Sequence, residues 1–350
     1  MATKNKHEFE DLSSYSSEAE YKKSRGTGKW KKVLMVFLSL ICVLMILVGC
    51  GFLYLSTYMF ADLTTNSITK DPAELGITEH TVTEKYIKNI ALFGVDTRSN
   101  DFTGRSDAIL VLSVDQVHNK IKMISLLRDI RVYMGDDYTY TGTGYDKITH
   151  AYQFGGPEYT IRVINQNFNL DITDYVTVNF TNMAKIVDAV GGVDLEITDG
   201  EVYEINKNLD DTNPDVKIYE SGLVHLNGDQ AVAYARIRNI GSDNGRAERQ
   251  QKVLTALLDV VVDMPVPSYP ETVKNMCALC ETSLDFNEIM GLAPIVLNGF
   301  TIEKTIIPDE NIEGFANGFM ENGGWMWTPD LDVAAQHIYE LIYEPENTEE

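Results

Sequence analysis

The longest apolar stretch lies near the amino terminus, where residues 33–61 carry no charged side chain. About 20 consecutive apolar residues are enough for a helix to cross a bilayer. Five Lys and Arg residues stand just before this stretch, in 23–32, whereas 62–74 are mixed and partly acidic. Because positive flanks stay in the cytoplasm, the pattern predicts an uncleaved signal anchor. The chain would be a single-pass, type II protein of the cell membrane with residues 62–350 extracytoplasmic.

From residue 87 onward, short β-branched runs alternate with segments of helical periodicity. The apolar runs predict strands at 86–96, 107–115, 120–127, 174–180, 193–197 and 301–308. The turn-like residues 116–119 predict that 108–115 and 120–127 form an antiparallel hairpin. Helices are predicted at 156–168, 181–192, 226–238, 245–263, 270–281, 285–300 and 330–343. Pro157 would start the first helix and Thr181 would cap the second. The mixture predicts an α/β fold with a mixed, largely antiparallel central sheet sandwiched between helices.

These patterns divide the chain into five parts. Residues 1–32 are polar and predicted to be disordered on the cytoplasmic side. The transmembrane segment 33–61 follows, then an extracytoplasmic linker at 62–86, one domain at 87–345 and a short tail at 346–350.

Charge is distributed unevenly between these parts. The chain has 29 Lys and Arg against 52 Asp and Glu, a formal charge of −23. Residues 1–32 hold 8 basic and 5 acidic side chains, so the part outside the membrane carries −26. So acidic a surface excludes nucleic acid as a partner, because nucleic-acid binding needs a basic footprint.

The four cysteines do not indicate chemistry. Cys42 and Cys50 fall in the apolar stretch, and "LVGC" at 47–50 resembles a lipidation box, although the long basic region before it favours an unmodified Cys50. Cys277 and Cys280 are compatible with a helical pair or with a local disulfide, and no partner set completes a metal site.

The first candidate site is "GVDTRSNDFTGRSDAIL", residues 94–110. Asp96 ends one predicted strand and Asp107 begins the next, so one sheet edge would hold both carboxylates. Two carboxylates suit a hard divalent cation such as Mg²⁺. Arg98 and Arg105 stand in the same glycine-containing loop. The alternative is a structural turn with salt bridges.

Two further candidates follow in the chain. In "LLRDIRV", Arg128 and Asp129 emerge after a very apolar run and Arg131 follows, although a surface ion pair would look the same. In "DKITHAYQFGG", Lys147 and His150 are flanked by aromatic residues and glycines; a lone histidine is more often structural.

The fourth candidate is "YARIRNIGSDNGRAERQQ", residues 234–251. Arg246, Arg249 and Gln250 fall at helical spacing on one face near a helix start. Arg236 and Arg238 converge with them only if the chain leaves the helix at "NIGSDNG". Asp243 stands among them and could orient an arginine or accept a proton. The alternative is a basic patch that neutralises the acidic surface.

Together these residues describe a site for a phosphate ester. Arginine forks match phosphate oxygens, and helix starts add positive potential. Phosphoryl transfer needs such positioning and charge neutralisation. No Walker motif occurs, so a nucleoside triphosphate is not indicated, and the membrane anchor points to a lipid-borne phosphate.

Six blocks of the sequence, in order, resemble the LytR-CpsA-Psr family. They are "IALFGVDTR…GRSDAILVLSV", "ISLLRDIRV", "DKITHAYQFGG", "VNFTNMAKIVDAVGGVDLEI", "LNGDQAVAYARIRN" and "DNGRAERQQKV". The blocks run from about 87 to 255, and "PDENIEGF…GGWMWTPD" carries the resemblance to about 345. The resemblance implies a membrane-anchored enzyme of the bacterial, chiefly Gram-positive, envelope, with a lipid tunnel in its core. Such phosphotransferases move teichoic acids or capsular polysaccharides from polyprenyl pyrophosphate to peptidoglycan.

The resemblance also implies roles for particular residues. Asp96 and Asp107 would hold Mg²⁺, with Mn²⁺ as the alternative. The pyrophosphate would be bound by Arg105, Arg128, Arg236, Arg238 and Arg246, with Lys147, Asn179, Gln250 and Asp243 nearby and Arg98 and Arg131 as further contacts. The catalytic set is therefore expected to be Asp96, Asp107, Arg105, Arg128, Arg246 and Asp243.

The chain departs from the family pattern at two neighbouring positions. Leu127 stands where the family usually has Pro, and Thr149 where it usually has Asn. Neither is a charged group of the site, so activity is still expected. Two other functions stay open: hydrolysis of the same pyrophosphate, and a non-catalytic receptor for an anionic lipid or polymer.

Overall fold

The computed structural model describes most of the chain beyond residue 40. The described residues are 41, 43–47, 49–51, 53–54, 56–97, 102–209, 216–309, 317–321 and 324–343. The chain divides into two compact units, Met1–Tyr58 and Met59–Glu350. The second unit contains every strand and every candidate site residue discussed below.

In the first unit, the described residues between 41 and 58 are helical. Within the described part of the chain, no helix is both long and apolar enough to span a bilayer. The predicted transmembrane segment 33–61 falls partly outside the described residues, at 33–40, 42, 48, 52 and 55. The inner segment 1–32 lies wholly outside them. Both therefore stay predictions.

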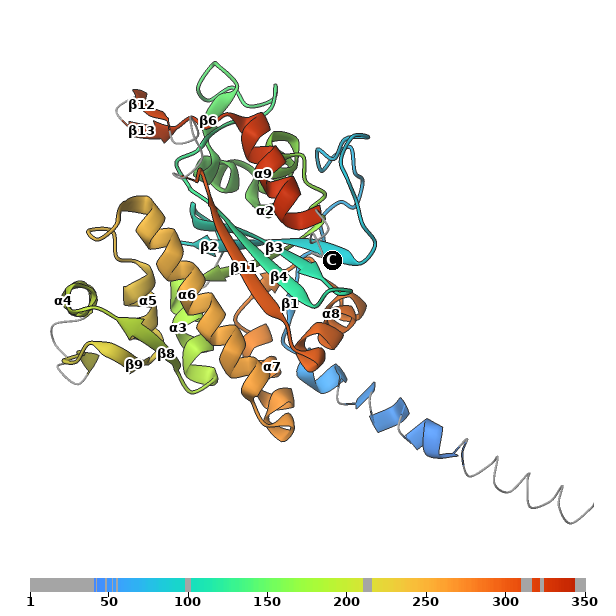
Figure 1. Ribbon diagram of the computed structural model, residues 1–350. Helices are drawn as coiled ribbons and strands as arrows, with labels where there is room; N and C mark the ends of the chain where they lie inside the picture. Colours follow the sequence, from blue (N-terminus) through green and yellow to red (C-terminus); the bar gives the residue numbers. More distant parts are fainter. Residues whose placement is uncertain are drawn as a thin grey trace, which may run out of the picture. The chain divides into compact units, whose positions relative to one another are not determined.

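A seven-stranded mixed sheet forms the centre of the second unit (Figure 1). Its spatial order is β1-β10-β7-β2-β3-β4-β11. The pairs β10–β7, β2–β3 and β3–β4 are antiparallel, and β1–β10, β7–β2 and β4–β11 are parallel. The strands are β1 Thr64–Thr65, β2 Ile87–Val95, β3 Ser106–Asp115, β4 Lys120–Leu126, β7 Asp174–Asn179, β10 Glu281–Thr282 and β11 Thr301–Ile307.

Three two-stranded ribbons and a set of helices complete the unit. The ribbons are β5 Arg131–Tyr133 with β6 Tyr145–Lys147, β8 Val193–Ile197 with β9 Gly222–Leu226, and β12 Gly318–Glu321 with β13 Gly324–Trp327. The helices are α2 Ile148–Phe168, α3 Phe180–Ala189, α4 Asp199–Asn208, α5 Gly228–Ala235, α6 Ser242–Asp263, α7 Tyr269–Cys277, α8 Phe286–Asn298 and α9 Leu331–Tyr343, with a 3₁₀ turn at Val266–Ser268.

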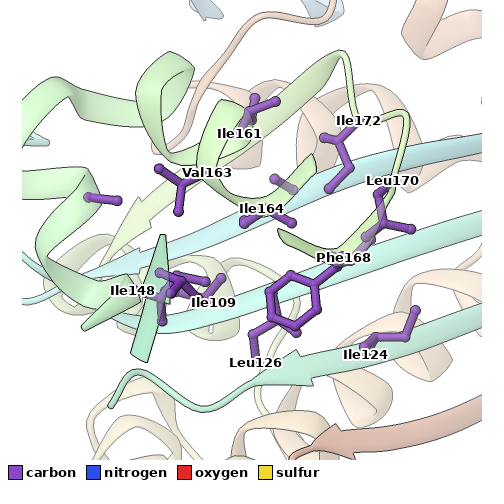
Figure 2. Close-up of a cluster of buried hydrophobic side chains, with 14 of the residues drawn as sticks. Ile109, Ile124, Leu126, Ile148, Ile161, Val163, Ile164, Phe168, Leu170 and Ile172 are labelled. Carbon is purple, nitrogen blue, oxygen red and sulfur yellow. The ribbon is translucent and has the colours of Figure 1, made fainter. Parts of the chain in front are cut away.

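Strand alternation divides the apolar side chains between two helical layers. Phe93 and Ile109 point to the face covered by α2 and α9, where they join one large core cluster. Figure 2 shows that core, with Ile109, Ile148 and Phe168 packed between α2 and the strands. The residues that alternate with them along the same strands point to the other face. That face is covered by α3, α5 and α6 (Figure 1). The sheet thus separates two layers, as the sequence pattern predicted.

The strand hairpin predicted at 108–115 and 120–127 is confirmed by the pairing of β3 with β4.

The helix predicted to start at Pro157 is the second part of α2. The first part, from Ile148, was missed because Gly155 and Gly156 interrupt the helical dihedrals, Gly156 at φ 69°. The prediction of Thr181 as a cap was wrong. Asn179 caps α3 instead, since its side chain accepts the Asn182 N–H at 2.7 Å.

The topology gathers several strand ends at one edge of the sheet. β2, β4, β7 and β11 run in the same direction and β3 runs against them. The ends of the first four strands and the start of β3 therefore lie together. A register shift at Gly94 and Val95 marks the end of β2, where Asp96 N–H donates to the Arg105 carbonyl at 3.3 Å. This edge brings Asp96, Asp107 and the segment after β4 into one region.

A buried ion cluster at the opposite end ties the linker to the sheet. Asp174 begins β7, and its side chain is fully buried. It accepts hydrogen bonds from the ammonium groups of Lys70 and Lys88 and from the Ser283 hydroxyl at 2.8 Å. Burial alone would raise the pKa of Asp174, but these donors outweigh it and lower the pKa to about 2. The ionised carboxylate is therefore part of the folded state.

We expect Asp174→Asn to lower the free energy of unfolding at pH 7 by about 2 kcal/mol or more. The folded pKa lies below the unfolded value, so this stabilisation is present above about pH 4 and is lost as the pH falls toward 2. Urea unfolding of the purified chain between pH 7 and pH 3 would measure it. Asp259→Asn, at an exposed position of α6, is the control. A difference between wild type and Asp174→Asn that does not shrink with falling pH would contradict this account.

Candidate anion site

Asp107, the second residue of β3, is the centre of a cluster of arginines. Its Oδ1 accepts from Arg128 Nη1 at 3.0 Å, and its Oδ2 accepts from Arg238 Nη2 at 3.0 Å. Its backbone carbonyl accepts from Arg246 Nη2 at 3.2 Å. One residue thus holds together guanidinium groups from the segment after β4, the loop after α5 and the first turns of α6.

The cluster continues from Arg128 to the start of α2. Arg128 Nε donates to Asp129 Oδ2 at 3.2 Å, and Lys147 Nζ donates to Asp129 Oδ1 at 2.6 Å. Burial opposes the charge of Arg128, but the carboxylates of Asp107 and Asp129 outweigh it and raise its pKa. Asp129 was noted in the sequence without a role. Its place between two cations could not be read from spacing.

Arg246 shows that the cluster carries excess positive charge. Its side chain is 5% exposed. Burial, together with the positive charges of Arg128 and Arg238, lowers its pKa, and the carboxylates of Asp107 and Asp243 offset this only in part. A bound anion would relieve this repulsion. The arrangement therefore fits a phosphate or pyrophosphate, for which arginine forks are well shaped.

Arg249, three residues further along α6, does not join the cluster. Its Nε donates to Glu201 Oε1 at 3.1 Å, and its other nitrogens donate to the carbonyls of Ile237 and Ile240. The helical spacing of Arg246 and Arg249 is as expected, but their side chains bond to different partners. Arg249 instead fixes the loop that carries Arg238, because it bonds the backbone on both sides of it.

The remaining predicted arginines lie around this centre at different distances from it. Arg236 caps the end of α5, and its guanidinium stacks 4.9 Å from the centre of the Phe180 ring. Arg131 lies on β5 with its guanidinium 4.3 Å from the centre of the Tyr145 ring. Arg105 is exposed, and its Nε donates to Gln153 Oε1 at 3.0 Å. Arg98 lies outside the described residues.

Asp96 and Asp107 offer a donor set that fits Mg²⁺ in part. Asp96 directly follows β2 and Asp107 lies on the neighbouring strand β3, at the edge where the arginines gather. Mg²⁺ in phosphate sites commonly takes one or two carboxylates and completes its shell with water and substrate oxygens. Within the described residues, no group of three or more His, Cys, Asp or Glu could hold a metal alone. A cation here would complete its shell with water and substrate oxygens. Both carboxylate oxygens of Asp107 accept hydrogen bonds from arginines.

An apolar cavity of about 320 Å³ begins beside the arginine cluster. It lies between the sheet and the helices α3, α5, α6 and α7, and its walls are almost entirely apolar. Ala108 and Ala235, which line it, directly follow Asp107 and directly precede Arg236. Gln250 lines it one turn after Arg246. The cavity follows α6 from Gln250 to Val261, a length of about 16 Å.

Small side chains open this cavity in a sheet otherwise rich in branched residues. A Cβ atom at Gly94 would lie 2.9 Å from that of Ala108, so the two strands meet closely there. Cys280 also lines the cavity, and neither Cys277 nor Cys280 forms a disulfide. Burial raises the pKa of Cys280 to about 12, so it is an unreactive wall residue. Gly94 and Ala108 are small residues in apolar strands, but only the packing of β2 against β3 shows that they line a cavity.

Asn179 and Asp243 complete the predicted set. Asn179 is buried, caps α3 and lines the cavity. Asp243 lies in the first turn of α6, close enough to influence the charge of Arg128 and Arg246. The structure thus gathers most of the predicted residues, whereas the side chains of Arg105 and Arg131 turn to neighbouring contacts.

Comparisons with known proteins show which chains this one is similar to. The sequence model of the LytR_cpsA_psr family matches residues 52–341. The polyisoprenyl-teichoic acid–peptidoglycan teichoic acid transferase TagT of Bacillus subtilis (strain 168) is 28% identical over 297 residues, which cover 81% of this chain and 86% of that protein. The TagU transferase of the same description from Enterococcus faecalis (strain ATCC 700802 / V583) is 28% identical over 304 residues, 85% of this chain and 91% of that protein.

A solved structure shares the fold. It is described as the LytR-CPS2A-psr family protein YwtF (TagT) with bound octaprenyl pyrophosphate lipid. The superposition has a TM-score of 0.58 at 22% identity and covers 78% of this chain and 98% of that one. These comparisons confirm the predicted family resemblance and the predicted mixed α/β fold of the second unit.

We expect Arg246→Ala and Arg249→Ala to act on different properties. Arg246→Ala should weaken the binding of inorganic pyrophosphate about tenfold or more, because it removes a buried donor from the cluster. Arg249→Ala should lower the free energy of unfolding by about 3 kcal/mol, because it leaves Glu201 buried without its partner. Titration calorimetry with pyrophosphate and urea unfolding would measure the two effects. Equal losses of binding in both variants would contradict the separation.

Proposed function

Because this chain belongs to the LytR_cpsA_psr family, we propose that it transfers a glycopolymer from polyprenyl pyrophosphate to peptidoglycan. Its relatives are named transferases, which confirms the prediction of an enzyme of this class. The observation that carries the proposal is the junction of the apolar cavity with the arginine cluster. A polyprenyl chain would occupy the cavity and its pyrophosphate would lie against Arg128, Arg238 and Arg246.

The reaction would form one phosphorus–oxygen bond and break another. A hydroxyl oxygen of the acceptor attacks the phosphorus that carries the glycan. The bond from that phosphorus to the bridging oxygen breaks, and polyprenyl phosphate leaves with the electron pair. The hydroxyl proton passes to a base, for which the carboxylates of Asp243 and Asp96 are the candidates. The product is a phosphodiester between glycopolymer and acceptor.

The arginines would stabilise the charge on the leaving phosphate. Arg246 and Arg128 are held in place before substrate arrives, so little reorganisation is needed in the transition state. Their mutual repulsion disfavours the empty site and favours the anion. Lys147, fixed by Asp129, adds a cation on the side of α2.

Mg²⁺ would be held by Asp96 and Asp107 and would neutralise pyrophosphate charge. Arg128 and Arg238, which contact Asp107, would bind the phosphate oxygens beside it. Localisation at the cell membrane, with the second unit extracytoplasmic, is supported by the apolar run at 33–61 and its basic flank. The lipid substrate is consistent with that location.

We expect Asp107→Asn and Arg246→Ala to lower the transfer rate by about 100-fold or more, because each removes charge stabilisation at the reacting phosphate. The assay mixes the full-length chain in detergent with a polyprenyl-pyrophosphate glycan, Mg²⁺ and soluble peptidoglycan fragments. Mass spectrometry would detect the phosphodiester product. Asp332→Asn, an exposed carboxylate at the start of α9, is the control and should keep wild-type rates.

Other results of the same assay identify the other functions. Free glycan phosphate without a phosphodiester product would indicate a hydrolase. Lipid binding that needs no metal, without turnover by the wild type, would indicate a receptor. Omission of Mg²⁺ with chelator should abolish transfer, and an unchanged rate would exclude the metal from the mechanism.

We expect Ala235→Phe to raise the KM for a long polyprenyl donor about tenfold, because the larger ring fills the cavity next to Arg236. A donor with a short prenyl chain should be affected less, since it needs less of the cavity. Initial rates at varied donor concentration would measure this. Ala73→Phe, at an exposed position, is the control. Equal effects on long and short donors would place the lipid elsewhere.

A further inference from the structure

A second pocket, of about 260 Å³, lies beside the first two turns of α2 and has no role in the mechanism above. It is just smaller than the range of about 300–1,000 Å³ typical of drug-sized ligands. Its lining combines aromatic rings with polar side chains. The lining residues are Arg105, Tyr138, Tyr140, His150, Gln153 and Phe154.

The aromatic side chains of this pocket are exposed although they are large. Tyr140 is 84% exposed and Phe154 is 50% exposed. Buried Tyr138 supports both, with its ring centre 5.0 Å from that of Phe154 in an edge-to-face contact and 6.4 Å from that of Tyr140. Exposed apolar surface rimmed by polar groups marks an interaction site. Aromatic rings in such a position pack well against the C–H face of a sugar ring.

The polar side chains of the pocket are held in place by their neighbours. Arg105 Nε donates to Gln153 at 3.0 Å, which leaves the terminal guanidinium nitrogens as donors toward a ligand. His150 Nδ1 lies 2.9 Å from Asp146 Oδ2, and the Tyr138 hydroxyl donates to the same oxygen. Burial would raise the pKa of Asp146, but these hydrogen bonds outweigh it and lower the pKa. A sugar ring can stack on the exposed aromatic side chains while its hydroxyl groups form hydrogen bonds with these fixed polar side chains.

The pocket adjoins the anion site through two short connections. Arg105 precedes Asp107 by two residues, about 7 Å along an extended strand. His150 follows Lys147 by three residues, about one helical turn. Thr149 holds this turn at the same edge of the sheet through two hydrogen bonds. Its N–H donates to the Arg128 carbonyl at 3.1 Å and its hydroxyl donates to the Ser106 carbonyl at 2.7 Å. A ligand in the pocket would therefore lie within about one sugar ring of the arginine cluster.

The pocket and the apolar cavity lie on opposite sides of the sheet. α2 covers one face of the sheet, and α3, α5 and α6 cover the other (Figure 1). Ile109 packs in the core on the α2 side, whereas Ala108 and Leu110 line the cavity on the other side. In displacement at phosphorus the attacking and leaving oxygens are roughly in line. In the proposed reaction the leaving polyprenyl phosphate lies on the side of the sheet with the apolar cavity. A hydroxyl that attacks from the opposite direction comes from the side of α2, where this pocket lies.

We propose that the pocket formed by Arg105, Tyr138, Tyr140, His150, Gln153 and Phe154 binds a pyranose ring of the carbohydrate acceptor. This inference rests on the proposed transferase function and adds to it the subsite that presents the attacking hydroxyl. Phe154 and Tyr140 stack on the ring, and Arg105 and Gln153 bind its hydroxyl or amide groups. The donor glycan offers similar ring chemistry, so the test separates the two.

The test uses the full-length chain in detergent, wild type and Tyr140→Ala/Phe154→Ala. Both side chains are exposed, so their loss should leave the fold intact, and the melting temperature checks this. We expect the KM for a soluble peptidoglycan glycan fragment to rise about tenfold or more. The KM for the polyprenyl-pyrophosphate donor and the rate of donor hydrolysis by water should stay within about twofold. Tyr203→Ala, at an exposed tyrosine on α4, is the control.

Each other outcome overturns the inference in a distinct way. An unchanged acceptor KM would show that the pocket does not bind the acceptor. A raised donor KM with an unchanged acceptor KM would assign the pocket to the donor glycan. If the wild type transfers nothing, the proposed function fails. Direct binding of the same peptidoglycan fragment, measured by saturation-transfer NMR on wild type and double variant, then decides the pocket alone, and equal signals from both would reject it.

Discussion

The site depends on one aspartate, Asp107, whose single negative charge stands among three positively charged arginines. Asp107 contacts Arg128 and Arg238 through its side chain and Arg246 through its carbonyl. Bringing charges of one sign together costs free energy. Burial and the positive charges of Arg128 and Arg238 lower the pKa of Arg246. The fold keeps these groups close because they stand on different rigid elements. A bound anion would neutralise this excess positive charge and reduce the repulsion between the arginines.

The central sheet gives the site two different sides. Alternate residues of β2 and β3 point to opposite layers, so one strand can contribute Val95 to a filled core and Gly94 to an open cavity. The α2 side is packed densely and supports a polar and aromatic pocket. The α6 side is left unfilled because its wall residues are small where they meet. A lipid and a carbohydrate can therefore approach the same phosphates without competing for space.

The acidic surface and the basic site have complementary effects. With −26 outside the predicted membrane segment, the protein repels most anions. Arg246 is nearly inaccessible from solvent, and Arg249 is used to fix a loop. The arginines around Asp107 thus concentrate positive charge at one edge of the sheet. A substrate that also fills the apolar cavity gains affinity that a small anion cannot.

The sequence determined the class of fold, the hairpin β3–β4, most helices and the identity of the charged residues, because these follow from local periodicity and local motifs. It also predicted that Arg246 and Asp107 belong to one site. It could not separate Arg246 from Arg249, because both lie on one helix and only the tertiary partners Asp107 and Glu201 assign their roles. Nor could it place Arg105 beside Gln153 or open the cavity at Gly94 and Ala108. Those features depend on contacts between residues far apart in the chain, which local pattern does not encode and which only packing across the sheet decides.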